Sequence, residues 1–182
     1  YQHFTSIADA VSIPGILYNV PSRTALNMDA ATTLRLADVP NIVGVKEASS
    51  DPDQIGYVIK DSPDGFKVWS WNDNEILSTM AMGGYGIVSV AGNIISGQIQ
   101  KMMRLILKGD LDAAAAEHLR LLPIFNALFY ITNPIPVRYA MNRSGFKVGP
   151  ARLPMVPDQL ELQAFGDKFD PIMDRYIIDL SE

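Results

Sequence analysis

Four short apolar segments alternate with helical patterns along most of the chain, at residues 15–20, 41–46, 66–70 and 86–91. The segments are apolar throughout rather than alternating, which is typical of parallel strands covered on both faces. Between them, apolar residues recur at helical spacing. The pattern predicts about four successive strand–helix units and therefore an α/β fold.

Start and stop signals flank the predicted helices. Asp51 precedes Pro52, which indicates an N-cap followed by proline at the first helical position. Asp73, Ser96 and Asp110 stand where they would cap the next three helices. Each of these segments is therefore expected to form a separate helix.

The strand–helix repeat ends near residue 130. We expect a first part at residues 1–130 and a helical C-terminal extension at residues 131–182, which contains several prolines. The chain starts at Tyr1, already inside a helical pattern and with no capping residue before it. This start indicates a fragment, a processed product or a truncated paralogue.

Composition excludes several kinds of function. The net charge is −5 and Lys and Arg are scattered, which argues against nucleic-acid binding. The chain has no cysteine, which fits a cytoplasmic protein and removes thiolate nucleophiles and Cys-ligated zinc. No apolar run is long enough for a membrane span. The two histidines, His3 and His118, are too far apart in sequence to suggest a metal site, so no metal is expected.

Lys46 is the strongest candidate for chemistry, because it ends the second apolar segment. A lysine in an apolar site loses hydration of its charged form, and a neutral amine can form an imine with a ketone. Tyr18 lies near the end of the first segment, where its phenol could move protons. Arg23, in the next loop, offers a planar set of donors for a carboxylate. The alternatives are a solvated Lys46–Glu47 pair, a core tyrosine and a solvated arginine.

Four motifs resemble one known family. Residues 18–24 read Tyr-Asn-Val-Pro-Ser-Arg-Thr, and residues 43–48 read Val-Gly-Val-Lys-Glu-Ala. Residues 83–90 and 133–138 resemble the family's last strand and the entry to its C-terminal helices. Together they resemble the dihydrodipicolinate synthase and N-acetylneuraminate lyase family. The resemblance implies a TIM (β/α)8 barrel, of which residues 1–130 would form a partial barrel.

This resemblance also implies specific roles. The chain would belong to a pyruvate-dependent class I aldolase-type lyase of lysine and diaminopimelate biosynthesis, and Lys46 would form the Schiff base with pyruvate. Tyr18 would relay protons, Arg23 would hold the carboxylate of the second substrate, aspartate semialdehyde, and Val88 would line the pyruvate pocket. No cofactor is implied, because the protonated imine itself accepts the electrons. A homo-oligomer is expected.

Two departures from the family leave alternatives open. Trp71 stands where the family usually has glycine, so its ring would either narrow the substrate site or point away from it. The family's N-terminal Gly-Thr-Thr segment has no match in the 182 residues, so an N-terminal half would have to come from elsewhere. The chain could therefore be a truncated, catalytically impaired oligomerising or binding module, or a related 2-keto acid aldolase with altered aldehyde specificity.

Overall fold

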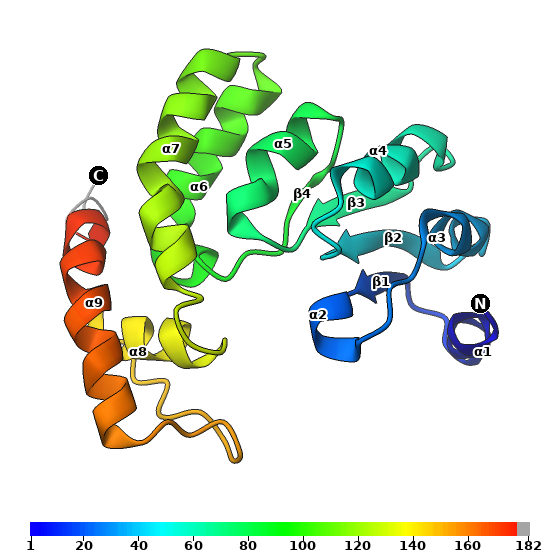
Figure 1. Cartoon of the computed structure of the whole chain (residues 1–182). Coiled ribbons are helices and arrows are strands. Elements are labelled where there is room, and N and C mark those ends of the chain that lie inside the picture. The colour runs from blue at the N-terminus through cyan, green and yellow to red at the C-terminus, as the bar shows by residue number, and fades with distance from the viewer. Residues whose placement is uncertain (178–182) are drawn as a thin grey trace. The chain divides into compact units, whose positions relative to one another are not determined.

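The computed structural model describes residues 1–177, and the chain divides into two compact units, Tyr1–Val88 and Ser89–Glu182 (Figure 1). The division expected from the sequence, at residue 130, rests on where the strand–helix repeat ends rather than on packing, and it stays a prediction. Residues 178–182, at the end of the expected extension, lie outside the described part.

A parallel four-stranded sheet in the order β1-β2-β3-β4 forms the centre of the first unit. Its strands are β1 (Gly15–Asn19), β2 (Ile42–Glu47), β3 (Lys67–Ser70) and β4 (Gly86–Ile87). Each strand pairs with the next one in sequence, as in a β/α barrel. The α/β class and the four strand–helix units expected from the sequence are confirmed.

The fourth strand is shorter than expected. The sequence predicted a strand at residues 86–91, but β4 ends at Ile87. The reason is its partner, because β3 ends at Ser70, which is already paired with Ile87. One further backbone hydrogen bond, from Val88 N–H to the Ser70 carbonyl at 3.0 Å, completes the pairing.

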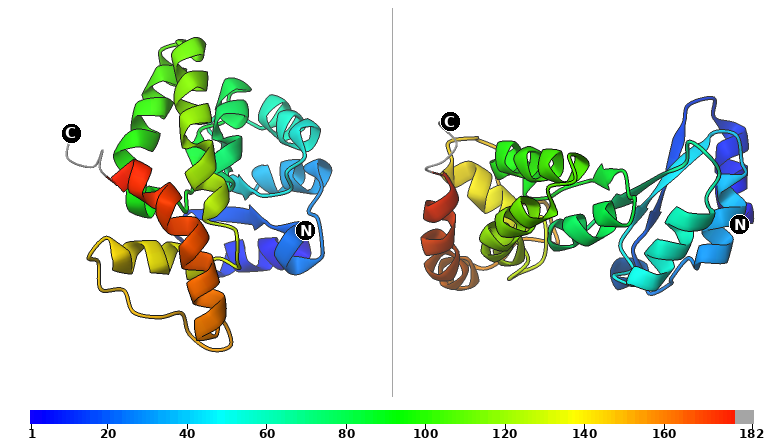
Figure 2. Two further views of the ribbon diagram at one scale, coloured as in Figure 1. Left: turned by 60° about the vertical axis from the view of Figure 1, so that its left-hand side comes forward. Right: turned by 90° about the horizontal axis from the view of Figure 1, so that it is seen from above.

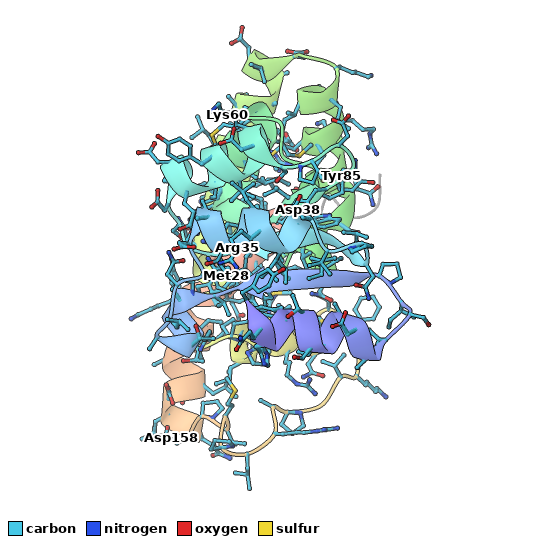
Figure 3. All side chains as sticks on the ribbon, turned by 90° about the vertical axis from the view of Figure 1, so that its right-hand side faces the viewer. Met28, Arg35, Asp38, Lys60, Tyr85 and Asp158 are labelled. Carbon is cyan, nitrogen blue, oxygen red and sulfur yellow. The ribbon has the colours of Figure 1, made fainter. Side chains whose placement is uncertain are left out.

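The helices of the first unit are α1 (Gln2–Ala10), α2 (Pro21–Thr24), α3 (Ala30–Ala37), α4 (Pro52–Asp61), the 3-10 turn η1 (Asp73–Glu75) and α5 (Ile76–Ala81). Of these, α1, α3 and α4 cover one face of the sheet. Helices α1, α3 and α4 lie side by side (Figures 1 and 3). Leu17, Val45 and Val68, one from each of the first three strands, are buried against them in the hydrophobic core.

The opposite face of the sheet, called the inner face here, is much more open. Ile16 is 53% exposed and Tyr18 41% exposed, whereas Leu17 between them is buried. Side chains alternate along a strand, so this difference distinguishes the two faces of β1. The inner face is where a barrel fold places its reactive residues.

One predicted cap is confirmed and another is wrong. The Asp51 carboxylate accepts hydrogen bonds from the backbone N–H groups of Asp53 and Gln54 and so caps α4. Asp73 does not cap α5, which follows Glu75 instead. Asp73 lies in η1 and is almost fully buried.

Four helices make up the described part of the second unit, and they are α6 (Gly92–Leu107), α7 (Leu111–Ala127), α8 (Ile135–Arg143) and α9 (Gln159–Ile177). Helices α6 and α7 lie antiparallel (Figures 1 and 2). The Asp110 side chain accepts from the Ala113 N–H and caps α7, as predicted. Helix α6 starts four residues before the predicted Ser96 cap, and Ile95 interrupts it with a kink.

Buried aromatic rings and one polar network hold α9 to its neighbours. Phe165 and Phe169 of α9 stack at 4.9 Å, and Tyr139 of α8 meets both edge-on. The Tyr176 hydroxyl donates to the Arg120 carbonyl on α7 at 2.6 Å.

Across residues 1–177, none of the helices is both long enough and apolar enough to cross a membrane.

Candidate active site

Strand register brings the candidate residues to one face of the sheet. Tyr18 is paired with Lys46, and Lys46 with Trp69. Paired residues of neighbouring parallel strands point to the same side, so all three side chains project from the inner face. They lie near the carboxyl ends of their strands, which is the end that carries the reactive groups in barrel enzymes.

Lys46 and Tyr18 are in direct contact. The Lys46 Nζ atom lies over the Tyr18 ring, 4.3 Å from its centroid. This is the distance of a cation–π contact, and it keeps the amine beside the phenol-bearing strand. The structure therefore brings together the two residues that the sequence singled out first.

Burial lowers the pKa of the Lys46 amine, because a charged ammonium loses hydration there. The nearby Asp73 carboxylate acts in the opposite direction and raises it. Sequence spacing assigned Asp73 to a helix cap and so missed this electrostatic role. Its position after the third strand was the only available signal.

The Tyr18 phenol has its pKa raised by burial. The positive charge of Arg23 and a side-chain hydrogen bond with Trp71 act against this effect and lower it. An indole can only donate, so the Trp71 N–H donates to the phenol oxygen. Arg23 and Trp71 thus both act on the same hydroxyl, from the β1 and β3 sides.

This hydrogen bond bears on the position of Trp71, which the sequence left open. Its ring is directed toward Tyr18, and its backbone N–H donates to the Glu47 carbonyl at 3.0 Å. A second indole, Trp69, lies over Gly44, where an added Cβ would come within 2.5 Å of the ring. Two tryptophans therefore shape the surroundings of Lys46 on the inner face.

Arg23 follows β1 and Val88 follows β4, which are the two edge strands of the sheet. Arg23 lies in the one-turn helix α2, directly after β1, and is exposed. Val88 follows β4 and is 43% exposed. It stands two residues after Gly86, which is paired with Trp69, so its side chain is expected on the inner face.

A buried polar cluster on the opposite face was missed by sequence reasoning. Glu47, which follows Lys46, is fully buried and accepts a hydrogen bond from the Asn19 amide at 2.8 Å. The alternative that Glu47 is the partner of a solvated lysine is wrong, because Glu47 is buried. The available signal was alternation, because adjacent residues of a strand point to opposite faces.

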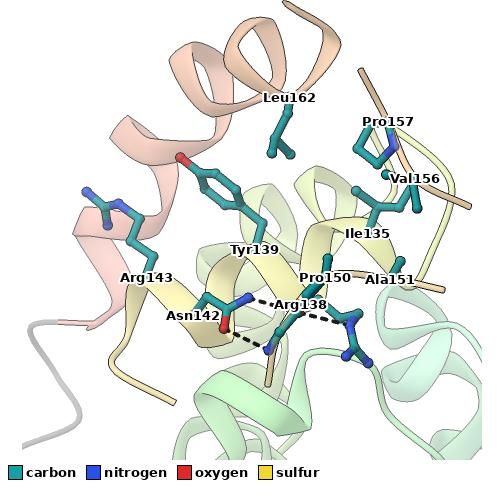
Figure 4. Close-up of a pocket in the computed structure, with 11 residues that line it drawn as sticks. Ile135, Arg138, Tyr139, Asn142, Arg143, Pro150, Ala151, Val156, Pro157 and Leu162 are labelled. Carbon is teal, nitrogen blue, oxygen red and sulfur yellow. Dashed lines mark hydrogen bonds between the residues drawn. The ribbon is translucent and has the colours of Figure 1, made fainter. Parts of the chain in front are cut away.

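Each unit contains a cavity, and the cavity of the first unit is lined by a candidate residue, Tyr18. One, of about 510 Å³, is lined by α1, residues 26–29 and the end of β1, including Tyr18. Another, of about 560 Å³, lies between α8, α9 and residues 149–157 (Figure 4). There Arg138 and Asn142 both donate hydrogen bonds to the Gly149 carbonyl, so they hold the loop that contains Gly149 in place.

Among the described residues, no group of three or more His, Asp or Glu side chains is arranged to hold a metal ion.

Comparison with known proteins agrees with the motifs. The model of the dihydrodipicolinate synthetase family matches residues 1–167. The chain belongs to this family. The matched range contains all five residues that the sequence assigned to the site, from Tyr18 to Val88.

Relatives in the dihydrodipicolinate synthetase family are similar at the level of both sequence and structure. A 4-hydroxy-tetrahydrodipicolinate synthase of Symbiobacterium thermophilum is 52% identical over 86% of this chain and 53% of its own length. The dihydrodipicolinate synthase structure of Aquifex aeolicus gives a TM-score of 0.91 at 34% identity over 97% of this chain and 59% of that one. The Acinetobacter baumannii enzyme, solved in complex with pyruvate, gives 0.85 at 32% identity, over 93% of this chain and 59% of that one.

The chain spans about half the length of the family members that it matches in sequence. The (β/α) arrangement described above is consequently a partial barrel relative to the solved members. These comparisons favour neither of the two alternatives that the sequence left open, the non-catalytic module or the aldolase of altered specificity.

Proposed function

We propose that this chain carries the imine-forming site of a lyase that condenses pyruvate with aspartate semialdehyde, a step of diaminopimelate and lysine biosynthesis. One observation carries the proposal, which is the partly buried Lys46 amine in contact with the Tyr18 ring on the inner face. The names of the family members support the reaction, and the pyruvate complex of one of them supports the first substrate.

The proposed chemistry begins with the neutral Lys46 amine. It adds to the ketone carbon of pyruvate, and the resulting carbinolamine loses water to give a protonated imine. The imine then draws electrons from the neighbouring methyl group, which loses a proton and becomes an enamine carbon. That carbon attacks the aldehyde and forms the new C–C bond. Tyr18 is proposed to carry protons to and from these intermediates.

Arg23, Trp71 and Val88 are proposed to shape the substrate site. Arg23 presents a guanidinium at the end of β1, which suits the carboxylate of the aldehyde substrate. Val88 would contact the methyl side of pyruvate. Trp71 donates a hydrogen bond to the Tyr18 phenol, so its ring would reduce the space beside the imine. No cofactor takes part in the proposed steps.

The setting of the reaction belongs to the proposal as well. We propose a homo-oligomer in the cytoplasm, with the remaining strands of the barrel supplied either by a longer form of the chain or by a separate polypeptide. The open inner face and the span of about half of the relatives' length support the need for such strands.

Trapping of the imine with borohydride tests the proposal directly. The full chain is incubated with pyruvate, reduced and analysed by peptide mass spectrometry. We expect one reduced pyruvyl group on Lys46. Lys46→Arg should abolish this adduct, because a guanidinium does not form the imine. Tyr18→Phe should slow its formation by roughly 100-fold or more.

The comparison protein is the Symbiobacterium thermophilum relative, treated in the same way. If that enzyme is labelled while the Lys46 peptide of this chain keeps its mass, the proposed chemistry is wrong for this chain. Labelling of exposed lysines such as Lys60 at the same rate as Lys46 would contradict it too.

A further inference from the structure

The two residues at the centre of the proposed reaction are each followed by a buried polar residue. Asn19 follows Tyr18, and Glu47 follows Lys46; they are 2% and 0% exposed. Because strand side chains alternate, both point away from the inner face, into the layer between sheet and helices. The strand register pairs Asn19 with Glu47, just as it pairs Tyr18 with Lys46.

Glu47 is surrounded by hydrogen-bond donors. Its Oε1 atom accepts from the Asn19 amide and from the Ser49 backbone N–H, both at 2.8 Å. Its Oε2 atom accepts from the Gln54 amide at 3.2 Å. The two carboxyl oxygens of Glu47 thus accept from three donors. These contacts join β1, β2 and the first turn of α4.

The same cluster reaches the segment that follows Arg23. The Asn19 side-chain amide also donates to the Asn27 side chain at 2.8 Å, and the side-chain oxygen of Asn19 accepts from the Met28 N–H at 2.9 Å. Gln54 accepts from the Asn27 amide at 2.8 Å. The segment after α2 is thus fixed by side chains at the ends of β1 and α4.

We propose that the buried Asn19–Glu47 hydrogen bond is a positioning device that holds the Tyr18 phenol, the Lys46 amine and the Arg23 segment in one mutual orientation. This inference rests on the proposed function. If either strand end rotated about its axis, donors and a carboxylate in a dry layer would lose their partners, which is strongly unfavourable. The backbone supports the same geometry, because the Ala48 N–H donates to the backbone carbonyl of Asn19 at 2.9 Å.

The positioning role predicts an effect on the rate of imine formation, even though Glu47 faces away from the substrate. Small displacements of reacting groups reduce rates steeply, by roughly 10- to 100-fold. Glu47→Leu should therefore slow pyruvate trapping on Lys46 by roughly that factor. Glu47→Gln keeps an oxygen for Asn19 and Ser49 and gives up only the acceptor for the Gln54 amide, so it should retain a rate within about threefold of the unchanged chain.

A control of similar destabilisation separates positioning from general loss of stability. Val58 is fully buried in α4, in the same core layer, but belongs to none of these hydrogen bonds. Val58→Ala should lower the unfolding midpoint without changing the trapping rate at temperatures where the chain is folded. If Glu47→Leu does not fold, Asn19→Leu breaks the same bond from the other strand.

A second measurement does not require imine chemistry. The pH dependence of acetylation of the Lys46 peptide reports how well that amine is shielded from water. We expect Glu47→Leu or Asn19→Leu to move the midpoint up toward the ordinary lysine range, and Glu47→Gln and Val58→Ala to leave it in place.

These two measurements separate the inference from the proposed function. If the unchanged chain traps no pyruvate but Glu47→Leu still shifts the acetylation midpoint, the proposed function fails and the positioning of Lys46 stands. If Glu47→Leu or Asn19→Leu matches Val58→Ala in every readout, the Asn19–Glu47 bond contributes only stability, and the inference is overturned.

Discussion

Burial moves the pKa values of Lys46 and Tyr18 in opposite directions, down for the amine and up for the phenol. Both shifts favour the uncharged form, because each group loses hydration of its charged form. A neutral amine beside a neutral phenol is the starting state that imine formation requires. The charge of Asp73 raises the pKa of Lys46 and the charge of Arg23 lowers the pKa of Tyr18, so each charge opposes the effect of burial.

Reactivity of Lys46 should therefore increase at lower pH than is ordinary for lysine. We expect the acetylation midpoint of the folded chain to lie below that of the same residue in urea. Between the two midpoints the unfolded chain binds more protons, so this residue makes the unfolding free energy rise with pH in that window. Asp73→Asn should lower the folded midpoint further, since it removes the charge that raises it. Equal midpoints in folded and unfolded chain would contradict the assignment.

Removal of the Trp71 N–H should raise the pKa of Tyr18. Trp71→Phe keeps an aromatic ring but loses the donor that stabilises the phenolate. The measurement is an ultraviolet phenolate titration, with the contribution of Tyr18 identified by subtracting the same variant carrying Tyr18→Phe. Trp69→Phe is the matched control, because that ring packs on Tyr85 instead. A common shift in both variants would indicate general loosening.

At the level of single residues, the sequence singled out the two residues that the structure brings into contact, Lys46 and Tyr18, but not the residues around them. Lys46 ends one apolar segment and Tyr18 lies near the end of another, and these positions are visible in the sequence. A surface pair was one alternative for Glu47, and Asp73 was assigned to a cap, because spacing alone does not report burial. Their roles depend on which side chains meet across strands, which only the folded register determines.

Gly44 shows how an element of the sheet depends on one missing side chain. A Cβ at this position would overlap the Lys67 carbonyl oxygen and come within 2.5 Å of the Trp69 ring. Glycine thus allows β3 and its indole to approach β2 closely. The same approach sets the spacing between Lys46 and the strand that carries Trp69 and Trp71.

Gly44→Ala should destabilise the first unit by about 1–3 kcal/mol through overpacking. Gly97→Ala, in the interior of α6, meets no atom within 4 Å and should stabilise the chain by about 0.5–1 kcal/mol. Urea unfolding monitored by tryptophan fluorescence and circular dichroism compares the two. An equal effect of both substitutions would show that the contact with β3 is not limiting.

Loss of the α4 cap should cost about 1 kcal/mol. Asp51→Ala removes the acceptor for two backbone N–H groups at the start of the helix. Asp64→Ala, in an exposed loop, removes the same charge without a cap and serves as the control. The difference in unfolding free energy between the variants isolates the cap. A difference near zero would mean that water replaces it fully.

At the level of elements, apolar segments and caps predicted most of the fold. Three of the four strands and helices α4 and α7 were located closely. The exceptions have local causes. Helix α2 is a single turn at residues 21–24, too short to show periodicity. The end of β4 depends on β3, and α6 begins before its kink at Ile95.

At the level of the whole molecule, exposed apolar side chains on the inner face favour association. Ile16→Glu should therefore reduce self-association of the chain, by making this face charged. Ile7→Glu is the control, because Ile7 on α1 is similarly exposed, 49% against 53%, but lies away from that face. Sedimentation velocity over a range of concentrations measures the effect. The same sedimentation profile for both variants would rule out the inner face as the contact.

The alternation of Tyr18 with Asn19 and of Lys46 with Glu47 also restricts how this sheet can change during evolution. Deleting one residue within β2 would turn the Glu47 carboxylate to the inner face and the Lys46 ammonium toward the packed helices, while the secondary structure could survive unchanged. Insertions or deletions in pairs would preserve the facing. Insertions or deletions in this strand should therefore be tolerated, if at all, only when they change its length by an even number of residues. The connecting loops are not restricted in this way.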